Sequence, residues 1–297
     1  MTPGARLRSH RGRASPDPLQ PLLSHLHTGP LRVWSLVITV FGDAILPRSG
    51  RVAMATLQEL MARLDIGAGT LRTALSRLAQ ENWVTRERAG RAAFYRLAAE
   101  GERDFDEAAR RIYAAGPPGW GGQWTILLTA ASSPRERQHW QRLGFGQTHP
   151  GTFVRPETEL MPPVEPEADA LLFREASLAS DLPHDTWPLE EIAAAYATVA
   201  ELIAATDAAL GEGTPVPLDA IAARVLLIHA WRRAVLRDPG LPPALLPSDW
   251  PAEPARAALR TVYQRLLAPS EAWLDEAARR SGGVPAQTDP RIFSRFG

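Results

Sequence analysis

The spacing of apolar residues divides the first hundred positions into helices followed by a hairpin. Apolar residues recur every three or four positions in residues 52–64 and again in residues 70–82, which predicts two amphipathic helices. Residues 83–97 are typical of two short strands around a turn at Gly90, a residue that tolerates a positive φ. This order of elements predicts a winged helix-turn-helix over residues 30–98. The apolar positions are Leu57, Leu60, Met61 and Leu64 in the first helix and Leu71, Leu75 and Leu78 in the second.

The segment before these helices has no decisive period. Residues 31–41 are almost wholly apolar and rich in β-branched side chains, so a buried helix and a buried strand both remain open. Residues 1–29 hold four prolines among Arg, Ser and Gly and show no sustained apolar spacing. We therefore expect residues 1–29 to form a disordered basic tail.

A second unit follows a clear boundary. Residues 99–118 continue as a linker helix that ends at the sequence Gly-Pro-Pro-Gly of residues 116–119. Beyond it the pattern predicts a strand, a helix, a hairpin and a further strand, an order typical of a small ferredoxin-like α+β domain over residues 119–182. These elements occupy residues 123–129, 134–143, 144–155 and 170–175.

The last third of the chain has a helical period. Apolar residues recur at helical spacing in residues 189–210, 218–236 and 254–267. A helical C-terminal domain is therefore predicted over residues 183–281, followed by a loose tail at residues 282–297. The expected fold class is α+β, with an N-terminal winged helix-turn-helix, a central ferredoxin-like α+β domain and a helical C-terminal domain.

The net charge of zero hides an asymmetry along the chain. Residues 1–100 contain 14 Arg and 7 acidic residues, a net charge of +7, and the remaining residues carry −7. A basic first third favours a polyanionic partner for that part, although a solvated basic face also remains open. The absence of cysteine excludes disulfides and thiolate zinc sites, and we expect neither metal nor cofactor. No apolar run reaches the roughly 18 residues of a membrane span, so we expect a cytoplasmic protein without membrane contact.

The predicted second helix carries side chains suited to DNA. Its core-facing side is apolar, and the opposite side would enter the major groove, where Arg binds guanine bidentately. The hairpin adds arginines placed for contact with the phosphate backbone or the minor groove. An amphipathic helix followed by a solvated hairpin is the alternative. The candidate DNA-binding residues are Thr70, Arg72, Thr73, Ser76 and Arg77 on the helix and Arg86, Arg88, Arg91 and Arg96 on the hairpin.

Eight short segments of the chain match a known family in the same order: VITVFGDAI (residues 37–45), RTALSRL (72–78), WT (124–125), LGFG (143–146), VRP (154–156), WRR (231–233), RDP (237–239) and LLPSDWP (245–251). With these segments the chain resembles the PaaX-type repressors of phenylacetate degradation. The resemblance runs in the same order from about residue 31 to residue 267 and covers all three predicted domains. Ala92 and Ala93 depart from it, because they stand where polar wing residues are expected, and this leaves the operator sequence open.

The resemblance implies a nucleoid-associated homodimer that binds operator DNA at an inverted repeat. It also implies repression of an aromatic-acid operon and release by an acyl-CoA effector, phenylacetyl-CoA first. A constitutive DNA-binding and dimerising scaffold without an effector is the alternative. The sequence contains no nucleophilic-serine motif, no phosphate-binding loop and no zinc-protease motif, so we do not expect an enzyme.

Phosphates of an acyl-CoA require cations, and one helix supplies them near its end. Trp231 and Trp250 would line an apolar slot beside these cations. Arg237, at the end of this helix, is more simply explained as a cation that stabilises a helix C-terminus. For Arg232 and Arg233, this structural role and a role in ligand binding are equally favoured. The candidate effector-binding residues are His229, Trp231, Arg232, Arg233 and Trp250.

Overall fold

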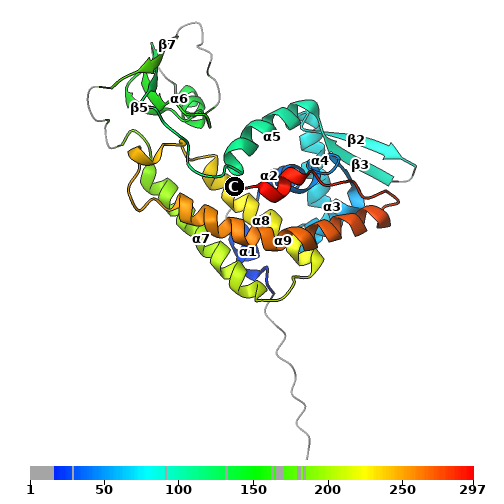
Figure 1. The fold of residues 1–297 in the computed structure, drawn as a ribbon. Coiled ribbons are helices and arrows are strands. Elements are labelled where there is room, and N and C mark those ends of the chain that lie inside the picture. The colour runs from blue at the N-terminus through cyan, green and yellow to red at the C-terminus, as the bar shows by residue number, and fades with distance from the viewer. Residues whose placement is uncertain are drawn as a thin grey trace, which may run out of the picture.

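The computed structural model combines long helices with two antiparallel sheets, which confirms the α+β class. The two sheets lie at opposite ends of the molecule, with the long helices between them (Figure 1). The structure describes the chain except residues 1–16, 29, 91, 131–132, 162–163, 165–169, 179–181 and 183–184.

The N-terminal unit contains the helices and the hairpin that the apolar spacing predicts. The open question over residues 31–41 is answered by a helix, which continues into one π-helical turn, η1, in which all five residues are buried. The strands form one antiparallel sheet in the order β1-β3-β2, and Gly90 has a φ of +61° at the hairpin turn. The elements are α2 (Val33–Val40), η1 (Phe41–Ile45), β1 (Arg51–Ala53), α3 (Met54–Arg63), α4 (Ala68–Gln80), β2 (Val84–Ala89) and β3 (Ala92–Leu97).

The predicted disorder of residues 1–29 is wrong for the part that the structure describes. Helix α1 (Gln20–Leu26) packs against α7 and α8. Its buried residues have the spacing i, i+3, i+4, i+7, which is typical of an amphipathic helix. The prolines nearby make this spacing hard to recognise in the sequence. The buried residues are Leu19, Leu22, Leu23 and Leu26. Residues 1–16 lie outside the described part of the chain.

The middle unit has one small core of its own and shares a second with the C-terminal part of the chain. The linker helix α5 (Ala99–Ile112) leads into a four-stranded antiparallel sheet with the order β5-β6-β4-β7. One face of this sheet packs on α6, whose Trp140 meets Leu127, Phe145 and Phe153. A capping box between Ser133 and Glu136 fixes the start of α6. The elements are β4 (Trp124–Thr129), α6 (Pro134–Arg142), β5 (Gly146–His149), β6 (Thr152–Pro156) and β7 (Ala170–Ala176).

Three long helices form the C-terminal unit: α7 (Leu189–Leu210), α8 (Pro217–Val235) and α9 (Ala252–Arg280). Helix α7 has the length and hydropathy of a membrane span; about 33% of its apolar window is buried, and it packs on α8 and α9. Helix α9 continues 13 residues beyond its predicted end through Pro269, because the apolar face beyond that proline is also buried. A short 3-10 turn, η2 (Pro243–Leu245), lies between α8 and α9.

The predicted loose tail at residues 282–297 is also wrong, because the end of the chain is docked. The turn η3 (Pro290–Ser294) buries Ile292, and Phe296 is 2% exposed. The Phe296 ring lies 5.4 Å from the ring centroids of both Tyr113 and Tyr263. The last residues therefore complete the core between α5 and α9.

The N-terminal and C-terminal units share one hydrophobic core. A single cluster of buried residues runs from α1, α2, α3 and α4 into α7, α8 and α9. The winged-helix and C-terminal domains predicted from the sequence are therefore packed around one core rather than two. A conformational change at the end of α8 can therefore be transmitted to α4 through the packed side chains of this core.

Candidate nucleic-acid interface and ligand pockets

Helix α4 presents its polar face to solvent because its apolar face is buried in the shared core. Leu71, Leu75 and Leu78 are each at most 1% exposed. All five residues expected to face DNA are exposed, and they lie on one side of the helix. These five are Thr70, Arg72, Thr73, Ser76 and Arg77.

The two arginines of α4 differ in their partners. Arg72 forms no hydrogen bond or ion pair with the described residues, so its guanidinium is free to bind a ligand. The Arg77 Nε lies 2.8 Å from Glu81 Oε1, and its guanidinium carbon lies 5.2 Å from the centroid of the Trp34 ring on α2. Arg77 is thus positioned by its own helix and by α2.

The hairpin of β2 and β3 also contains free and paired arginines. Arg86 and Arg88 are exposed and have no partner in the described part of the chain. Arg96 lies 3.7 Å from Glu87, and the Arg51 Nε lies 2.9 Å from the same carboxylate. Arg51 is not among the candidate residues predicted from the sequence, because only the pairing of β1 with β3 brings it to the hairpin. Arg91 lies outside the described residues.

A buried ionic cluster joins the N-terminal unit to the C-terminal helices. Asp43, in the π-helical turn η1, is 0% exposed. Its Oδ2 accepts a hydrogen bond of 2.7 Å from Arg224 Nε of α8, and its Oδ1 accepts one of 2.8 Å from Arg295 near the C-terminus. The hydroxyls of Tyr113 and Tyr263 donate to the same Oδ1 at 2.8 and 3.0 Å. The carboxylate is therefore fully satisfied by four different elements.

The cluster extends along α9. Arg224 also donates to Glu271 at 2.8 Å, and Arg48 forms ion pairs with Glu271 and Asp275. Burial raises the pKa of Tyr263 to about 12, so its hydroxyl stays protonated as a donor. No pattern in the sequence predicted this cluster. Its one local signal is Arg224, a single charge in the middle of an apolar helix.

The structure separates the five candidate effector residues. Trp231 is 0% exposed, and its indole nitrogen donates to the Ile112 carbonyl at 2.8 Å. Its ring packs on Tyr196 and Phe296, so the expectation that it lines a ligand slot is corrected: it is a core residue.

His229 and Arg232 connect α8 to α2. The Thr39 hydroxyl lies 3.0 Å from His229 Nδ1, and Arg232 donates to that hydroxyl at 2.9 Å and to the Ser35 carbonyl at 3.0 Å. Burial, followed by the charges of Arg232, Arg233 and His25, lowers the pKa of His229 to about 3. The imidazole is therefore neutral. The side chains of His229 and Arg232 act first as contacts that hold α8 against α2.

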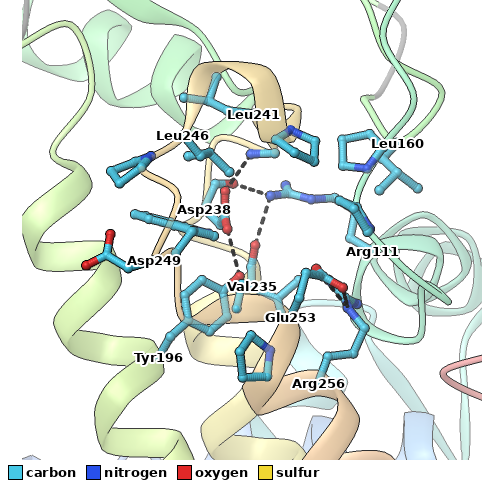
Figure 2. Close-up of a pocket in the computed structure, with 18 of the residues that line it drawn as sticks. Arg111, Leu160, Tyr196, Val235, Asp238, Leu241, Leu246, Asp249, Glu253 and Arg256 are labelled. Carbon is cyan, nitrogen blue, oxygen red and sulfur yellow. Dashed lines mark hydrogen bonds and ion pairs between the residues drawn. The ribbon is translucent and has the colours of Figure 1, made fainter.

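A first cavity, of about 380 Å³, lies where the linker helix, the middle unit and the C-terminal helices meet (Figure 2). Its apolar lining includes Leu160, Leu241, Leu246 and Trp250. Residues 246–250 belong to the LLPSDWP segment of the family resemblance, and most of that segment borders this space.

Polar groups fix one wall of this first cavity. The Asp238 carboxylate accepts a hydrogen bond of 2.7 Å from the Tyr196 hydroxyl and another from the Gly240 amide. Arg111 donates to the carbonyls of Val235 and Asp238 (Figure 2). Burial raises the pKa of Asp238. Since these polar groups are paired with one another and most of the lining is apolar, this cavity suits an apolar group.

A second cavity, of about 600 Å³, lies between α1, α2, α7 and the end of α8. It contains His229 and Arg233 of the predicted effector set, together with Arg237. Trp250 therefore lies in a different cavity from His229 and Arg233. Ala195 of α7 lines the second cavity, and the adjacent Tyr196 lines the first. Both cavities therefore border the α7–α8 pair.

Comparisons with known proteins agree with this arrangement. The family model described as PaaX-like protein matches residues 32–101, and the one described as PaaX-like protein C-terminal domain matches residues 187–276. An uncharacterized protein of Mycobacterium tuberculosis has a similar fold, with a TM-score of 0.51 and 23% identity over 80% of this chain and 97% of that one. The transcriptional repressor PaaX of Escherichia coli K12 is 31% identical over 291 residues, which cover 90% of this chain and 91% of the relative. This chain therefore belongs to the PaaX family of transcriptional repressors.

Proposed function

We propose that the protein is a cytoplasmic, nucleoid-associated repressor of a phenylacetate-type catabolic operon, which binds operator DNA through α4 and the β2–β3 hairpin. We take α3, α4 and the sheet β1-β3-β2 as a winged helix-turn-helix. We take α6 with the sheet β5-β6-β4-β7 as a ferredoxin-like domain. The observation that carries the DNA proposal is the exposed polar face of α4, where Arg72 has no partner among the described residues. Arg in this position suits the acceptor atoms of guanine in the major groove.

Arg72→Ala tests this proposal. We expect operator binding to weaken by about 1–3 kcal/mol if Arg72 contacts a base. Gel-shift titration of the full chain measures the effect, with Arg137→Ala as the control. Arg137 is an exposed arginine on α6 without an ion pair in the described residues, and its loss should leave operator binding unchanged. Equal operator affinity in both variants would remove α4 as the reading helix.

We further propose a two-fold dimer on an inverted repeat, since a symmetric dimer reads symmetric half-sites. The middle unit supports this, because Leu171 and Phe173 on its edge strand β7 are 63% and 49% exposed. Leu171→Asp combined with Phe173→Asp should yield a monomer that binds the full operator weakly. Sedimentation of the full chain at micromolar concentration decides this, and an unchanged dimer mass would move the interface elsewhere.

The effector we propose is an aryl-CoA thioester, phenylacetyl-CoA first, with its aryl group in the first cavity beside Trp250. The mostly apolar lining and the volume of about 380 Å³ support this. Free phenylacetate should bind much more weakly, because it lacks the phosphates. Calorimetry with the thioester and with the free acid separates the two, and Trp250→Ala should weaken thioester binding.

The alternative is a DNA-binding and dimerising scaffold without an effector. The extensive packing of the C-terminal helices on the N-terminal unit is compatible with it. Operator titrations with and without phenylacetyl-CoA distinguish the two functions. Unchanged operator affinity at saturating thioester favours the scaffold, because a ligand shifts an equilibrium only through different affinities for the two states.

A further inference from the structure

The second cavity collects positive charge without a matching negative charge. Arg32, Arg233 and Arg237 line it, together with His25 and His229, and no acidic side chain is among its described lining residues. All three arginines are exposed, and none of their side chains has a hydrogen bond or ion pair within the described part of the chain. Some arginines in other parts of the structure do have acidic partners, as Arg63 has in both Asp17 and Asp219.

A favourable position at a helix end explains only part of this charge. Arg233 and Arg237 lie near the C-terminus of α8, where a cation is stabilised by the helix dipole. Arg32 and His25 come from other segments, and they converge on the same concave space. Both histidines of the cavity have lowered pKa values. Burial, followed by the charge of Arg233, lowers the pKa of His25. Burial, followed by several positive charges that include Arg233, lowers the pKa of His229. Such a cavity is suited to an anion.

The wall of this cavity reaches the recognition helix. Trp34, half-buried at the start of α2, lines the cavity, and the Arg77 guanidinium of α4 lies 5.2 Å from the centroid of its ring. On the inner side, Thr39 binds His229 and Arg232, so α2 is fixed to α8. A ligand that displaces the Trp34 ring therefore changes the position of Arg77 directly.

We propose that this cavity binds the phosphate groups of a nucleotide-bearing anion, here the coenzyme A part of the effector, and that the ligand acts on α4 through Trp34 and Arg77. The inference rests on the proposed function for the identity of the thioester. The cavity volume of about 600 Å³ accommodates a substantial part of such a ligand. Leu31, Trp34 and Val199 offer apolar surface beside the arginines.

Calorimetry on the full chain with phenylacetyl-CoA, coenzyme A and free phenylacetate tests the location. Arg233→Ala combined with Arg237→Ala should weaken binding of the thioester and of coenzyme A by at least about tenfold, since each charge-assisted hydrogen bond to a phosphate is among the stronger ones. Both side chains are exposed, so the fold should persist in the circular dichroism spectrum. Arg135→Ala combined with Arg137→Ala removes two exposed arginines of α6 and should change binding less than twofold.

Trp34→Leu tests the connection to α4. This variant keeps an apolar side chain in the wall but loses the cation–π contact with Arg77. We expect thioester affinity within about threefold of the parent, while the thioester no longer releases the operator as the parent does. Release equal to that of the parent overturns the role of Trp34.

The outcomes separate this inference from the proposed function. Unchanged thioester binding in the Arg233/Arg237 double variant overturns the cavity as the site and leaves the repressor function intact. Binding of coenzyme A that depends on both arginines, without any release of the operator by the thioester, supports the cavity and overturns the proposed effector. If the parent protein binds neither molecule, both the cavity and the effector are wrong, and operator binding is judged from Arg72→Ala alone.

Discussion

The arginines of the Asp43 cluster and the arginines of α4 and the hairpin show two uses of the same side chain. Arg224 is 0% exposed and bound to Asp43 and Glu271, and Arg295 completes the same carboxylate. Arg72 and Arg88 are exposed and have no partner among the described residues. The chain has no lysine, so residue type alone says nothing about these roles. The distribution of partners indicates which arginines stabilise the fold and which remain available to a ligand.

The largest effect is expected where the loss of an arginine removes a strong partner from a buried carboxylate. Arg224→Met should lower the free energy of unfolding by about 3–5 kcal/mol, because Asp43 would then be a buried charge with one strong partner fewer. Urea unfolding followed by circular dichroism measures this change. The control is Arg279→Met at an exposed ion pair of α9, where the change should stay within about 0.5 kcal/mol. Equal stability of the two variants would show that the cluster does not hold the units together.

The next effect is expected on α4, and it concerns DNA rather than stability. Arg77→Ala should weaken operator binding by about 1–3 kcal/mol and reduce discrimination against other sequences, if the guanidinium reads a guanine. Stability should change little, because the ion pair with Glu81 is exposed. Competition gel shifts with unrelated DNA measure the discrimination. A loss of affinity that is equal for all sequences would assign Arg77 to the phosphate backbone.

His229 provides a pH-dependent comparison at the contact between α8 and α2. Its pKa of about 3 in the folded protein lies below the ordinary value of 6.5, so the unfolded chain binds the proton first. Its contribution to stability is complete above pH 6.5 and is lost as the pH falls toward 3. Between pH 7 and pH 5 this loss is at most about 2 kcal/mol. His229→Asn should flatten the dependence of unfolding free energy on pH in this window, and an unchanged slope would show that other groups cause it.

The smallest effect is expected at the hairpin. Arg88→Ala should weaken binding to all DNA sequences about equally and lower the slope of log affinity against log salt by about one unit, as the loss of one phosphate contact does. Titrations between low and moderate salt measure the slope. Arg96→Ala is the matched comparison, because Arg96 lies next to Glu87 and should contribute less. A salt slope that is identical in the parent and in Arg88→Ala would place the hairpin away from DNA.

The sequence predicted those elements whose signal is local. The apolar periods of α3, α4, α7 and α8 lie within each helix, and the hairpin turn is marked by Gly90. The exposed side of α4 follows from the same period, since its buried face is set by Leu71, Leu75 and Leu78. The resemblance to the PaaX family was also available from the sequence, and the comparisons confirm it.

The tertiary structure decided what depends on residues far apart in the chain. Asp43 and Arg224 are 181 positions apart, and no local pattern pairs them. Burial against distant helices explains three further features: α1 is a packed helix, α9 continues through Pro269, and Phe296 is docked. The same holds for the candidate effector residues on α8, which are close in sequence: the packing of α8 on α2 and α5 buries Trp231, whereas Arg233 lines a cavity. Helical spacing fixes the direction of a side chain relative to its own helix, and only the neighbouring elements determine whether that direction leads to the core, to a cavity or to solvent.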